Sequence, residues 1–482
     1  MSRSQITSGA ADWFGLKNLS WPQRFIAVCF FLSIVVLPVD VFPWIAPASY
    51  TLRHLAFYPI AAGVAVALPF MPGIWRKRKE FLIFGGLFGL FLLWIMLVSF
   101  WNRGFSMAVG KDLCKFMFSL GIWWGMGIFY ATVFFLLPFA LAKRILWGGL
   151  VTVSMLCIAY SMLELAWFGE VPGAESILLA LNPLFRKTCF AWEWWPPELC
   201  VGRLRSLFSE PLFMSLLAVP ALIFFWGRYL AERKRKAWFL LAAAWSVLIY
   251  FSFSRTGWII LVGSLGLQYL LLEYVGFFRG KGLLYRVVPY AGAVAVLFLV
   301  VCLFYVITSL TPEANSSGGS LCIQGGIPIS EGVDLGGGSL NVRKTALISE
   351  MKIIRQRPLC GYGVDLYGTL LWDAYNELEY RESEIQLWVN AGSCPMLNMY
   401  TGIGIEFGLV GAILFLGICS FPLWLFCKKS SFNWFQIAAI AALCGLLLAG
   451  MAIQTYIHVA FQLFWGIALA AAIGERQDES NL

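Results

Sequence analysis

The sequence predicts an all-α polytopic membrane protein with about 12 transmembrane helices and a large outer loop that contains amphipathic helices. Of its 482 residues, 60% are hydrophobic and 13% are charged, whereas soluble domains carry about 25% charged residues. Long apolar stretches recur along the chain, and clusters of Lys and Arg separate them. This composition excludes a disordered, coiled-coil or nucleic-acid-binding protein, although the formal net charge is +9.

The apolar stretches are long enough to cross a bilayer. A span needs about 20 mostly apolar residues, and it must be helical because only a helix satisfies its own backbone N–H and C=O groups in lipid. The stretches that meet this requirement are 25–42, 54–71, 81–100, 116–138, 145–167, 211–227, 237–253, 257–275, 287–308, 402–426, 434–453 and 456–474. An even number of crossings predicts that both termini lie on one side.

The distribution of Lys and Arg predicts the orientation. One set of alternate short connections holds Arg76 to Lys79, Lys143-Arg144, Arg233 to Lys236 and Lys428-Lys429. Basic residues accumulate in cytoplasmic loops, so we predict that this side and both terminal segments, 1–24 and 475–482, are cytoplasmic. The basic excess then reflects membrane topology rather than a partner such as nucleic acid.

Two outer segments are too long to be simple connections. One is a loop at 168–210 within the first nine spans (25–308), and the other is a large loop at 309–401 that precedes the last three spans (402–474). In the second loop, apolar residues recur at three-to-five-residue steps from Val342 to Arg355 between charged ones, which predicts an amphipathic helix. Pro358 is expected to end this helix.

Four arginines of the outer segments are candidate ligands: Arg203, Arg205, Arg255 and Arg343. A guanidinium near the membrane is costly unless it is paired or faces a wet cavity, and its fork of N–H groups matches phosphate oxygens. Several of them around one cavity would make an anion site. The alternative for any single arginine is a structural pair, for example with Glu210, or a side chain that reaches the interface.

Five short motifs follow one another on the outer side: an Arg-rich segment before a span (Arg203 to Pro211), a Ser-Arg-Thr-Gly junction (Ser254 to Gly257), the arginine of the loop helix (Arg343), a Pro-Leu-x-Gly-x-Gly turn (Pro358 to Gly363) and a span entrance with Asn398, Glu406, Gly408 and Gly411. In order and placement these motifs resemble the O-antigen polymerase and O-antigen ligase family of GT-C-like membrane glycosyltransferases. The resemblance covers roughly 200–415.

The resemblance implies an enzyme of the bacterial inner membrane that polymerises undecaprenyl-pyrophosphate-linked oligosaccharides on the periplasmic face. It implies catalytic roles for Arg255, Arg343 and Glu210. It also implies a pyrophosphate or glycan site made by Arg203, Arg205, Arg255, Arg343, Asn398 and Tyr362. No Asp-x-Asp motif occurs in the outer loops, so we expect a metal-independent reaction without a cofactor. The expected partners are the lipid-linked donor, a glycan acceptor, the bilayer and a chain-length regulator, with no nucleic acid.

The sequence departs from the family at one position. Ligases of the family carry histidine before the asparagine, where this chain has Leu397. This difference favours a polymerase over a ligase that transfers glycan to lipid A-core. The bases that remain on the outer side include Glu210, Asp365 and His458, of which His458 has a structural alternative. A transporter or flippase of lipid-linked sugars is the alternative of another class, although such proteins bind substrate near the midplane.

Overall fold

The computed structural model describes residues 19–42, 51–185, 199–200, 203–232, 235–277, 322–324, 327–328, 338–378, 383–390, 392, 394–429 and 431–474. Among these residues, seven helical segments are long and apolar enough to cross a membrane: Phe57–Lys77, Lys79–Arg103, Met107–Leu136, Phe139–Phe168, Pro211–Ala231, Arg255–Tyr274 and Met399–Phe426. The first combines α3 (Phe57–Ala67), a short 3-10 turn and α4 (Met71–Lys77). The others are α5, α6, α7, α9, α11 and α16. The predicted helical, polytopic membrane protein is confirmed at this level.

Five apolar helices are shorter: α2 (Trp21–Val35), α8 (Ala174–Phe185), α10 (Lys236–Phe251), α17 (Trp434–Ala449) and α18 (Val459–Gly474). Helix α8 lies in the loop predicted at 168–210. Each predicted span except 287–308 overlaps one of the long or short apolar helices, and 287–308 lies outside the described residues. The predicted number of about 12 crossings therefore stays a prediction.

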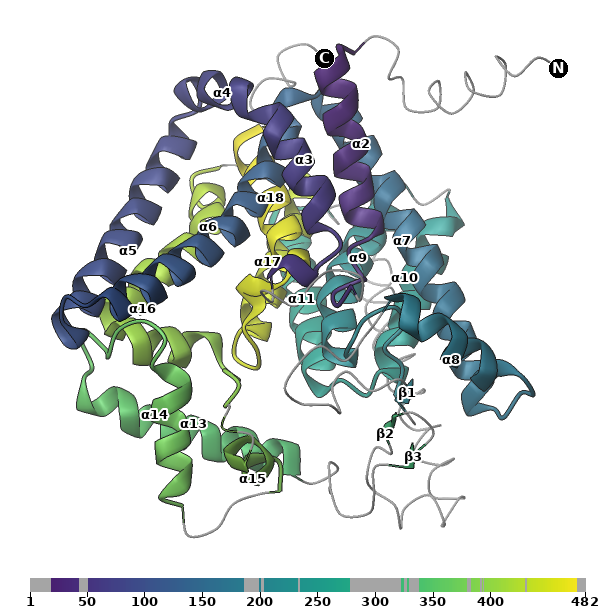
Figure 1. Cartoon of the computed structure of the whole chain (residues 1–482). Coiled ribbons are helices and arrows are strands. Elements are labelled where there is room, and N and C mark those ends of the chain that lie inside the picture. Colours follow the sequence, from purple (N-terminus) through teal and green to yellow (C-terminus); the bar gives the residue numbers. More distant parts are fainter. Residues whose placement is uncertain are drawn as a thin grey trace.

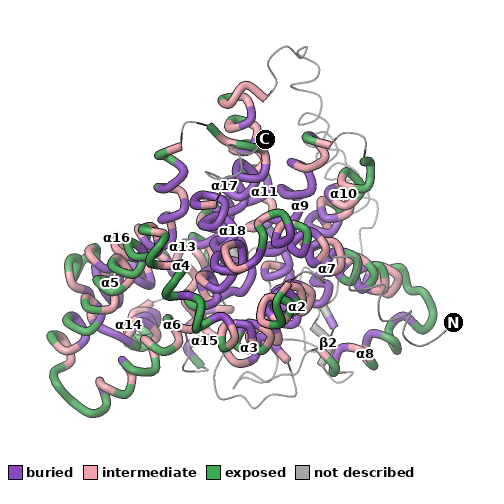
Figure 2. Tube along the Cα trace, turned by 90° about the horizontal axis from the view of Figure 1, so that it is seen from above, coloured by how far each residue is buried: buried purple, intermediate pink, exposed green. Residues whose placement is uncertain are grey.

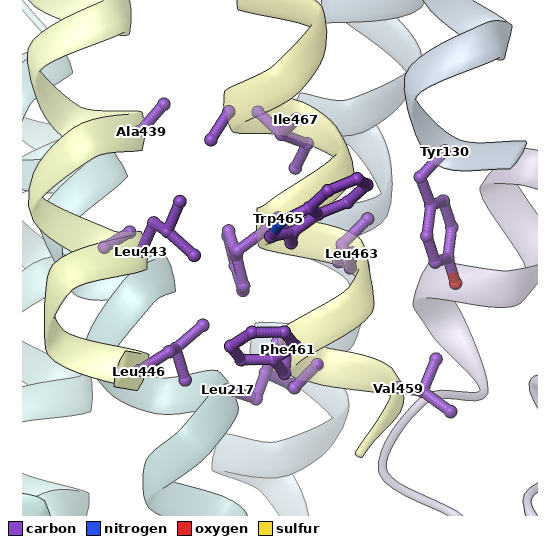
Figure 3. Close-up of a cluster of buried hydrophobic side chains, with 14 of the residues drawn as sticks. Tyr130, Leu217, Ala439, Leu443, Leu446, Val459, Phe461, Leu463, Trp465 and Ile467 are labelled. Carbon is purple, nitrogen blue, oxygen red and sulfur yellow. The ribbon is translucent and has the colours of Figure 1, made fainter. Parts of the chain in front are cut away.

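Helix α18 forms the centre of the helical bundle. It packs most extensively against α6 and also against α16 and α17. The approach to α6 is close because glycines face each other there: a Cβ added at Gly466 would lie 2.5 Å from the Gly127 carbonyl oxygen. Small residues at a helix contact let two membrane helices come together without a hydrophobic driving force. Around this contact, Trp465 and Phe461 fill the interior between α6 and α17 (Figure 3).

Large apolar side chains also cover the outside of the bundle. On α5, Leu90, Leu93 and Leu97 are exposed, and the tube view shows a buried centre around α9, α17 and α18 with exposed positions on outer helices such as α5 (Figure 2). A soluble protein rarely exposes so much apolar surface. The arrangement fits a bundle whose outer face contacts lipid.

Cations of two of the alternate connections lie at one end of the bundle. The Lys143 ammonium is 4.7 Å from the centroid of the Phe435 ring, and the Lys429 ammonium donates to the Ala471 carbonyl (3.1 Å). At the opposite end lie α13 (Gly338–Gln356), α14 (Tyr367–Asn376) and α15 (Ser383–Asn390), as Figure 1 shows. The helix predicted from Val342 to Arg355 is thereby confirmed, with additional residues at its beginning.

Helices α13, α14 and α15 form a small unit with its own hydrophobic core. The core contains Val342 and Ala346 of α13, Leu371 of α14, and Ile385 and Trp388 of α15. We call these three helices the cap. A short antiparallel sheet, β1 (Leu199–Cys200), β2 (Cys322–Gln324) and β3 (Ile327–Pro328), joins the two predicted outer loops in the order β1-β2-β3. The two loops therefore meet at the end of the bundle that carries the cap.

Helix α16 is broken at Gly408, and the turn after α13 fills the break. Gly408 has φ 66° and ψ −171° inside the helix. Across the break, the amide of Gly363 donates to the Glu406 carbonyl (2.7 Å), and the amide of Leu409 donates to the Pro358 carbonyl (2.8 Å). Backbone groups near a membrane must be satisfied, and irregular backbone is tolerated only where protein covers it. The Pro-Leu-x-Gly-x-Gly motif thus attaches the cap to α16.

Candidate functional site

Four charged residues, each near the beginning of a different helix, form an electrostatic group at the cap end of the bundle. Glu210 is the N-cap of α9, Arg255 is the first residue of α11, and Glu384 lies in the first turn of α15. All three act electrostatically on Arg343 of α13. Two predicted pyrophosphate ligands, Arg255 and Arg343, and the predicted catalytic Glu210 are therefore brought together, with Glu384 as an additional member. We call these four residues the charged cluster.

Arg343, on which the other three members act, is half-buried. Its Nη1 donates to the Ala452 carbonyl, which lies between α17 and α18, at 2.7 Å. Burial lowers the pKa of the Arg343 guanidinium, Glu384 and Glu210 counteract this effect, and Arg255 adds to it. Arginine is not deprotonated in proteins, so the guanidinium keeps its charge. One edge of the guanidinium is thus tied to the bundle, which orients the cation.

Arg255 owes its position to the Ser-Arg-Thr-Gly junction between α10 and α11. Ser254 caps α11, and its Oγ accepts a hydrogen bond from the Gly257 amide at 3.1 Å. A Cβ at Gly257 would collide with the Ser215 side chain of α9, so only glycine lets α9 and α11 meet there. The contact holds the beginning of α11 against α9, and the Arg255 side chain is exposed. Helix packing therefore explains the glycine of the motif, and the exposed Arg255 side chain is accessible to a ligand.

Arg205 differs from the other predicted arginine ligands because it is buried, with 1% of its surface exposed. Its Nη1 donates to the Ser209 carbonyl (3.4 Å), and its backbone amide donates to Glu164 Oε2 (3.3 Å). Arg203 is half-buried, and its Nε donates to the Ser252 carbonyl (3.2 Å). These contacts fasten the segment that leads into α9. Arg203 and Arg205 as ligands stay predictions, and their observed contacts are with the protein itself.

Two buried carboxylates, one on α7 and one in the segment after α2, hold the same segment. Glu164 of α7 accepts from the Ser206 amide (2.8 Å). Asp40 accepts from the Ser209 amide (3.0 Å to Oδ1) and from the Ser209 hydroxyl (2.6 Å to Oδ2). Buried carboxylates must be hydrogen-bonded to be tolerated. Because Ser209 precedes Glu210, these bonds hold the chain next to the N-cap residue of α9.

Asn398 and Tyr362, the remaining predicted substrate ligands, have structural contacts. The Asn398 side chain caps α16 and accepts from the amides of Tyr400 (2.9 Å) and Thr401 (3.3 Å). The Tyr362 hydroxyl donates to Gln356 Oε1 at 2.7 Å. Capping of α16 therefore explains why an asparagine occupies this position of the motif. Binding of substrate by either residue stays a prediction.

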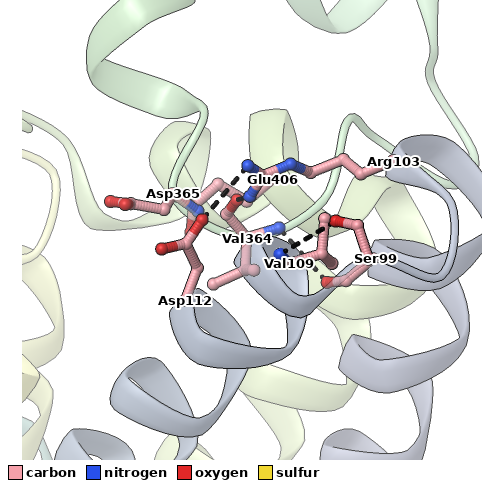
Figure 4. Close-up of polar contacts among 8 residues, drawn as sticks. Ser99, Arg103, Val109, Asp112, Val364, Asp365 and Glu406 are labelled. Atoms are coloured by element: carbon pink, nitrogen blue, oxygen red, sulfur yellow. Dashed lines mark hydrogen bonds and ion pairs between the residues drawn. The ribbon is translucent and has the colours of Figure 1, made fainter.

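The structure places the two other predicted bases, Asp365 and His458, in different surroundings. Asp365 is exposed; its amide donates to Glu406 Oε1 (3.1 Å), and its carboxylate points away from Arg103 (Figure 4). His458 is buried, with its ring 4.4 Å from the Phe213 ring and 6.3 Å from the His54 ring. Packing inside the bundle supports the structural alternative for His458. Neither residue is among the groups whose charge acts on Arg343.

Sequence reasoning did not identify Glu384 or Glu350, and neither belongs to a motif. Glu350 of α13 is 1% exposed and accepts hydrogen bonds from the hydroxyls of Tyr367 (2.6 Å) and Thr401 (2.6 Å). Tyr367 begins α14 and Thr401 lies in the first turn of α16. Glu350 therefore connects α13 to both α14 and α16. Its place between apolar residues of an amphipathic helix was the one available signal. In the described part of the chain, no three His, Cys, Asp or Glu side chains are grouped like metal ligands.

Glu350 is expected to make the stability of the cap depend on pH. Burial raises the pKa of its carboxyl above the ordinary value of a glutamic acid, and the hydrogen bonds from Thr401 and Tyr367 oppose this effect. The folded state then favours the protonated acid, so this stabilisation is complete below the unfolded-state pKa and is lost as pH rises through the folded-state value. Glu350→Gln should have a melting temperature that depends less on pH between 4 and 8, with about the same value as wild type at the acid end. Differential scanning fluorimetry in detergent measures this, with Glu377→Gln at an exposed position of the cap as the control. Equal pH slopes in Glu350→Gln and wild type would refute the assignment.

Comparison with known proteins gives one family. The family model described as O-antigen ligase matches residues 239–416, from α10 into α16. The matched segment contains Arg255, Arg343 and Glu384, while Arg205 and Glu210 precede it. No curated protein matches the chain. The match confirms the resemblance found in the motifs.

Proposed function

We propose, from the O-antigen ligase domain at residues 239–416, that the protein polymerises undecaprenyl-pyrophosphate-linked oligosaccharide repeat units on the periplasmic face of the inner membrane. The observation that carries this proposal is the charged cluster, in which Arg255 and Arg343 lie with two carboxylates at the cap end of the bundle. Such a site suits the headgroup of a lipid pyrophosphate, whose tail remains in the bilayer while its sugars extend toward the cap.

The cluster supplies what glycosyl transfer from a lipid pyrophosphate requires. As the bond between the anomeric carbon and the pyrophosphate oxygen breaks, negative charge grows on the leaving group. Two guanidinium groups and the N-terminus of α11 favour that charge, and they do so most where water is excluded. The acceptor hydroxyl then attacks the opposite face of the anomeric carbon, with inversion. We propose that these protein cations neutralise the pyrophosphate in a metal-independent reaction.

The acceptor decides between the two activities of the family. We favour polymerisation because Leu397 stands where ligases carry histidine. Ligation to lipid A-core is the second candidate, and the description of the matching family favours it. The two reactions share the donor and the leaving group, so the charged cluster serves either.

We also propose the orientation and extent of the membrane domain. In this arrangement the cytoplasmic side holds the end of the bundle with Lys143 and Lys429, together with the segments 1–24 and 475–482. The twelve spans lie within 25–308 and 402–474, and the loop at 309–401 is periplasmic. The gathering of cations at the end opposite the cap supports it. Labelling of single introduced cysteines from each side of intact cells tests it.

The activity is tested with purified protein in lipid nanodiscs, to which the native undecaprenyl-pyrophosphate-linked repeat unit is supplied. We expect a ladder of longer lipid-linked glycans on gels and by mass spectrometry, also in the presence of EDTA. Transfer to lipid A-core without a ladder would establish the ligase instead. Absence of both products, together with movement of the lipid-linked sugar between leaflets in proteoliposomes, would replace the proposal with transport.

A further inference from the structure

We propose that the open cavity between the end of α5 and the turn after α13 binds the headgroup of an anionic glycerophospholipid. The cavity is lined by none of the four residues of the charged cluster, and its occupant does not depend on the proposed glycosyl transfer. The bound lipid stabilises the turn that attaches the cap to α16.

The cavity is built from two segments that hydrogen bonds hold together. It has a volume of about 520 Å³ and is lined by Trp101 and Asn102 at the end of α5 and by the turn from Arg357 to Gly361. The Asn102 Nδ2 donates to the Gly361 carbonyl (3.0 Å), and the Arg357 Nη1 donates to Asn102 Oδ1 (2.8 Å). Asn102 therefore fixes both the turn and the arginine at the cavity.

Arg357 brings a positive charge to the cavity. Its guanidinium lies over the Tyr362 ring, 4.9 Å from the ring centroid, and its side chain is exposed. In the part of the chain that the structure describes, no carboxylate forms an ion pair with Arg357. The fork of a guanidinium matches the oxygens of a phosphate, and basic pockets at a membrane surface bind anionic lipid headgroups. The cavity therefore suits a phosphate ester.

An exposed apolar stripe of α5 leads to the cavity. Leu90, Leu97 and Trp101 are seven and four residues apart, about two turns and one turn, so they share one face of the helix. All three are exposed, Trp101 by 86%, on an outer helix of the bundle (Figure 2). At 1.5 Å per residue the stripe is about 16 Å long, and half of the hydrocarbon core measures about 15 Å. The stripe thus has the length of an acyl chain in one leaflet.

The stripe and the cavity together favour a phospholipid over a soluble ligand. A free phosphate or a sugar would use the polar groups of the cavity and leave the stripe uncovered. Trp101 at the end of the stripe, followed by the exposed Phe105 and Met107, is typical of a chain at the interface between lipid and water. A lipid uses both parts, because its phosphate contacts Arg357 while an acyl chain covers Leu90 and Leu97.

The site is coupled to the attachment of the cap. Pro358, next to Arg357, accepts a hydrogen bond from the Leu409 amide across the break in α16. A ligand that holds Arg357 against α5 therefore also holds this connection. A ligand that binds only the folded protein raises its melting temperature, so the anionic lipid should stabilise the protein.

The test measures binding of dioleoyl phosphatidylglycerol to the detergent-purified protein by native mass spectrometry, with dioleoyl phosphatidylcholine as the neutral lipid. We expect Arg357→Ala to lower the affinity for phosphatidylglycerol by about tenfold, the usual contribution of a hydrogen bond to a charged group. Phosphatidylglycerol should raise the melting temperature of wild type more than phosphatidylcholine does, and Arg357→Ala should lose this difference. Arg355→Ala is the matched control, because Arg355 is an exposed arginine of α13 that does not line the cavity.

Two further variants keep the proposal testable if Arg357→Ala fails to fold. Arg357→Lys keeps the charge and should recover part of the affinity, because an ammonium lacks the fork of N–H groups. Trp101→Ala changes an exposed side chain and should also weaken binding of phosphatidylglycerol. Fluorimetry without added lipid measures whether each variant is folded.

Three results would overturn the proposal. The first is equal affinity and equal stabilisation in Arg357→Ala and Arg355→Ala. The second is displacement of phosphatidylglycerol by soluble glycerol phosphate at the same concentration, which would show that the apolar stripe takes no part. The third is displacement by undecaprenyl pyrophosphate at a lower concentration, which would assign the cavity to the lipid-linked donor. The proposed glycosyl transfer is tested separately by the ladder assay, so either proposal can fail without the other.

Discussion

Replacing Arg343 with alanine is expected to lower the rate of glycosyl transfer by about 10²–10³-fold, the usual cost of removing one preorganised donor from a developing anion. Arg343 is half-buried, its Nη1 donates a hydrogen bond to the Ala452 carbonyl, and the charges of the other three members of the charged cluster act on it. Alanine removes the cation while Arg255 remains. The ladder assay in nanodiscs measures the rate, and fluorimetry of the same samples measures whether the fold is retained.

Two further variants make this prediction specific. Lys344→Ala removes the next cation of α13, whose side chain is exposed, and should leave the rate unchanged. Arg343→Lys should recover only part of the rate, because an ammonium lacks the fork of N–H groups that matches phosphate oxygens. Full-length polymer at a normal rate from Arg343→Ala would exclude the proposed anion site.

Replacing Gly408 with alanine is expected to lower the free energy of unfolding by at least about 2 kcal/mol. The loss has two causes, the positive φ at this position and a steric collision of the new Cβ. Gly408 has φ 66°, and a Cβ there would overlap the Leu359 carbonyl. The variant must either straighten α16 or expel the turn from Pro358 to Gly363. Because this turn connects α13 to α16, the cap would lose its attachment, and activity should fall with stability.

The melting temperature in detergent, measured by tryptophan fluorescence, tests this prediction. Gly89→Ala is the matched control, because Gly89 lies within α5 with open space around its Cα and should accept alanine without loss. A Gly408→Ala protein as stable as wild type would show that the break in α16 does not depend on the backbone freedom of glycine.

The sequence predicted the elements of the site better than their roles. Arg205 and Arg343 are both arginines of the outer segments, and nothing in the local sequence distinguishes them. The structure buries Arg205 beside Ser209 and places Arg343 among other charges. Glu384 had no motif, since its importance comes from Arg343, which is far away in the chain. Asn398, a residue of the matched motifs, caps a helix.

The sequence by itself determined that this is a helical membrane protein with motifs that resemble those of the O-antigen polymerase and ligase family. Hydrophobicity is a sum over neighbouring residues, and backbone hydrogen bonding in lipid allows only helices for such stretches. Only the tertiary structure decided which charges meet. Glu210, Arg255, Arg343 and Glu384 come from four helices, and they meet because Gly257 lets α11 approach α9 and the break at Gly408 receives the turn from the cap. Such contacts depend on the packing of distant segments, which local sequence patterns do not encode.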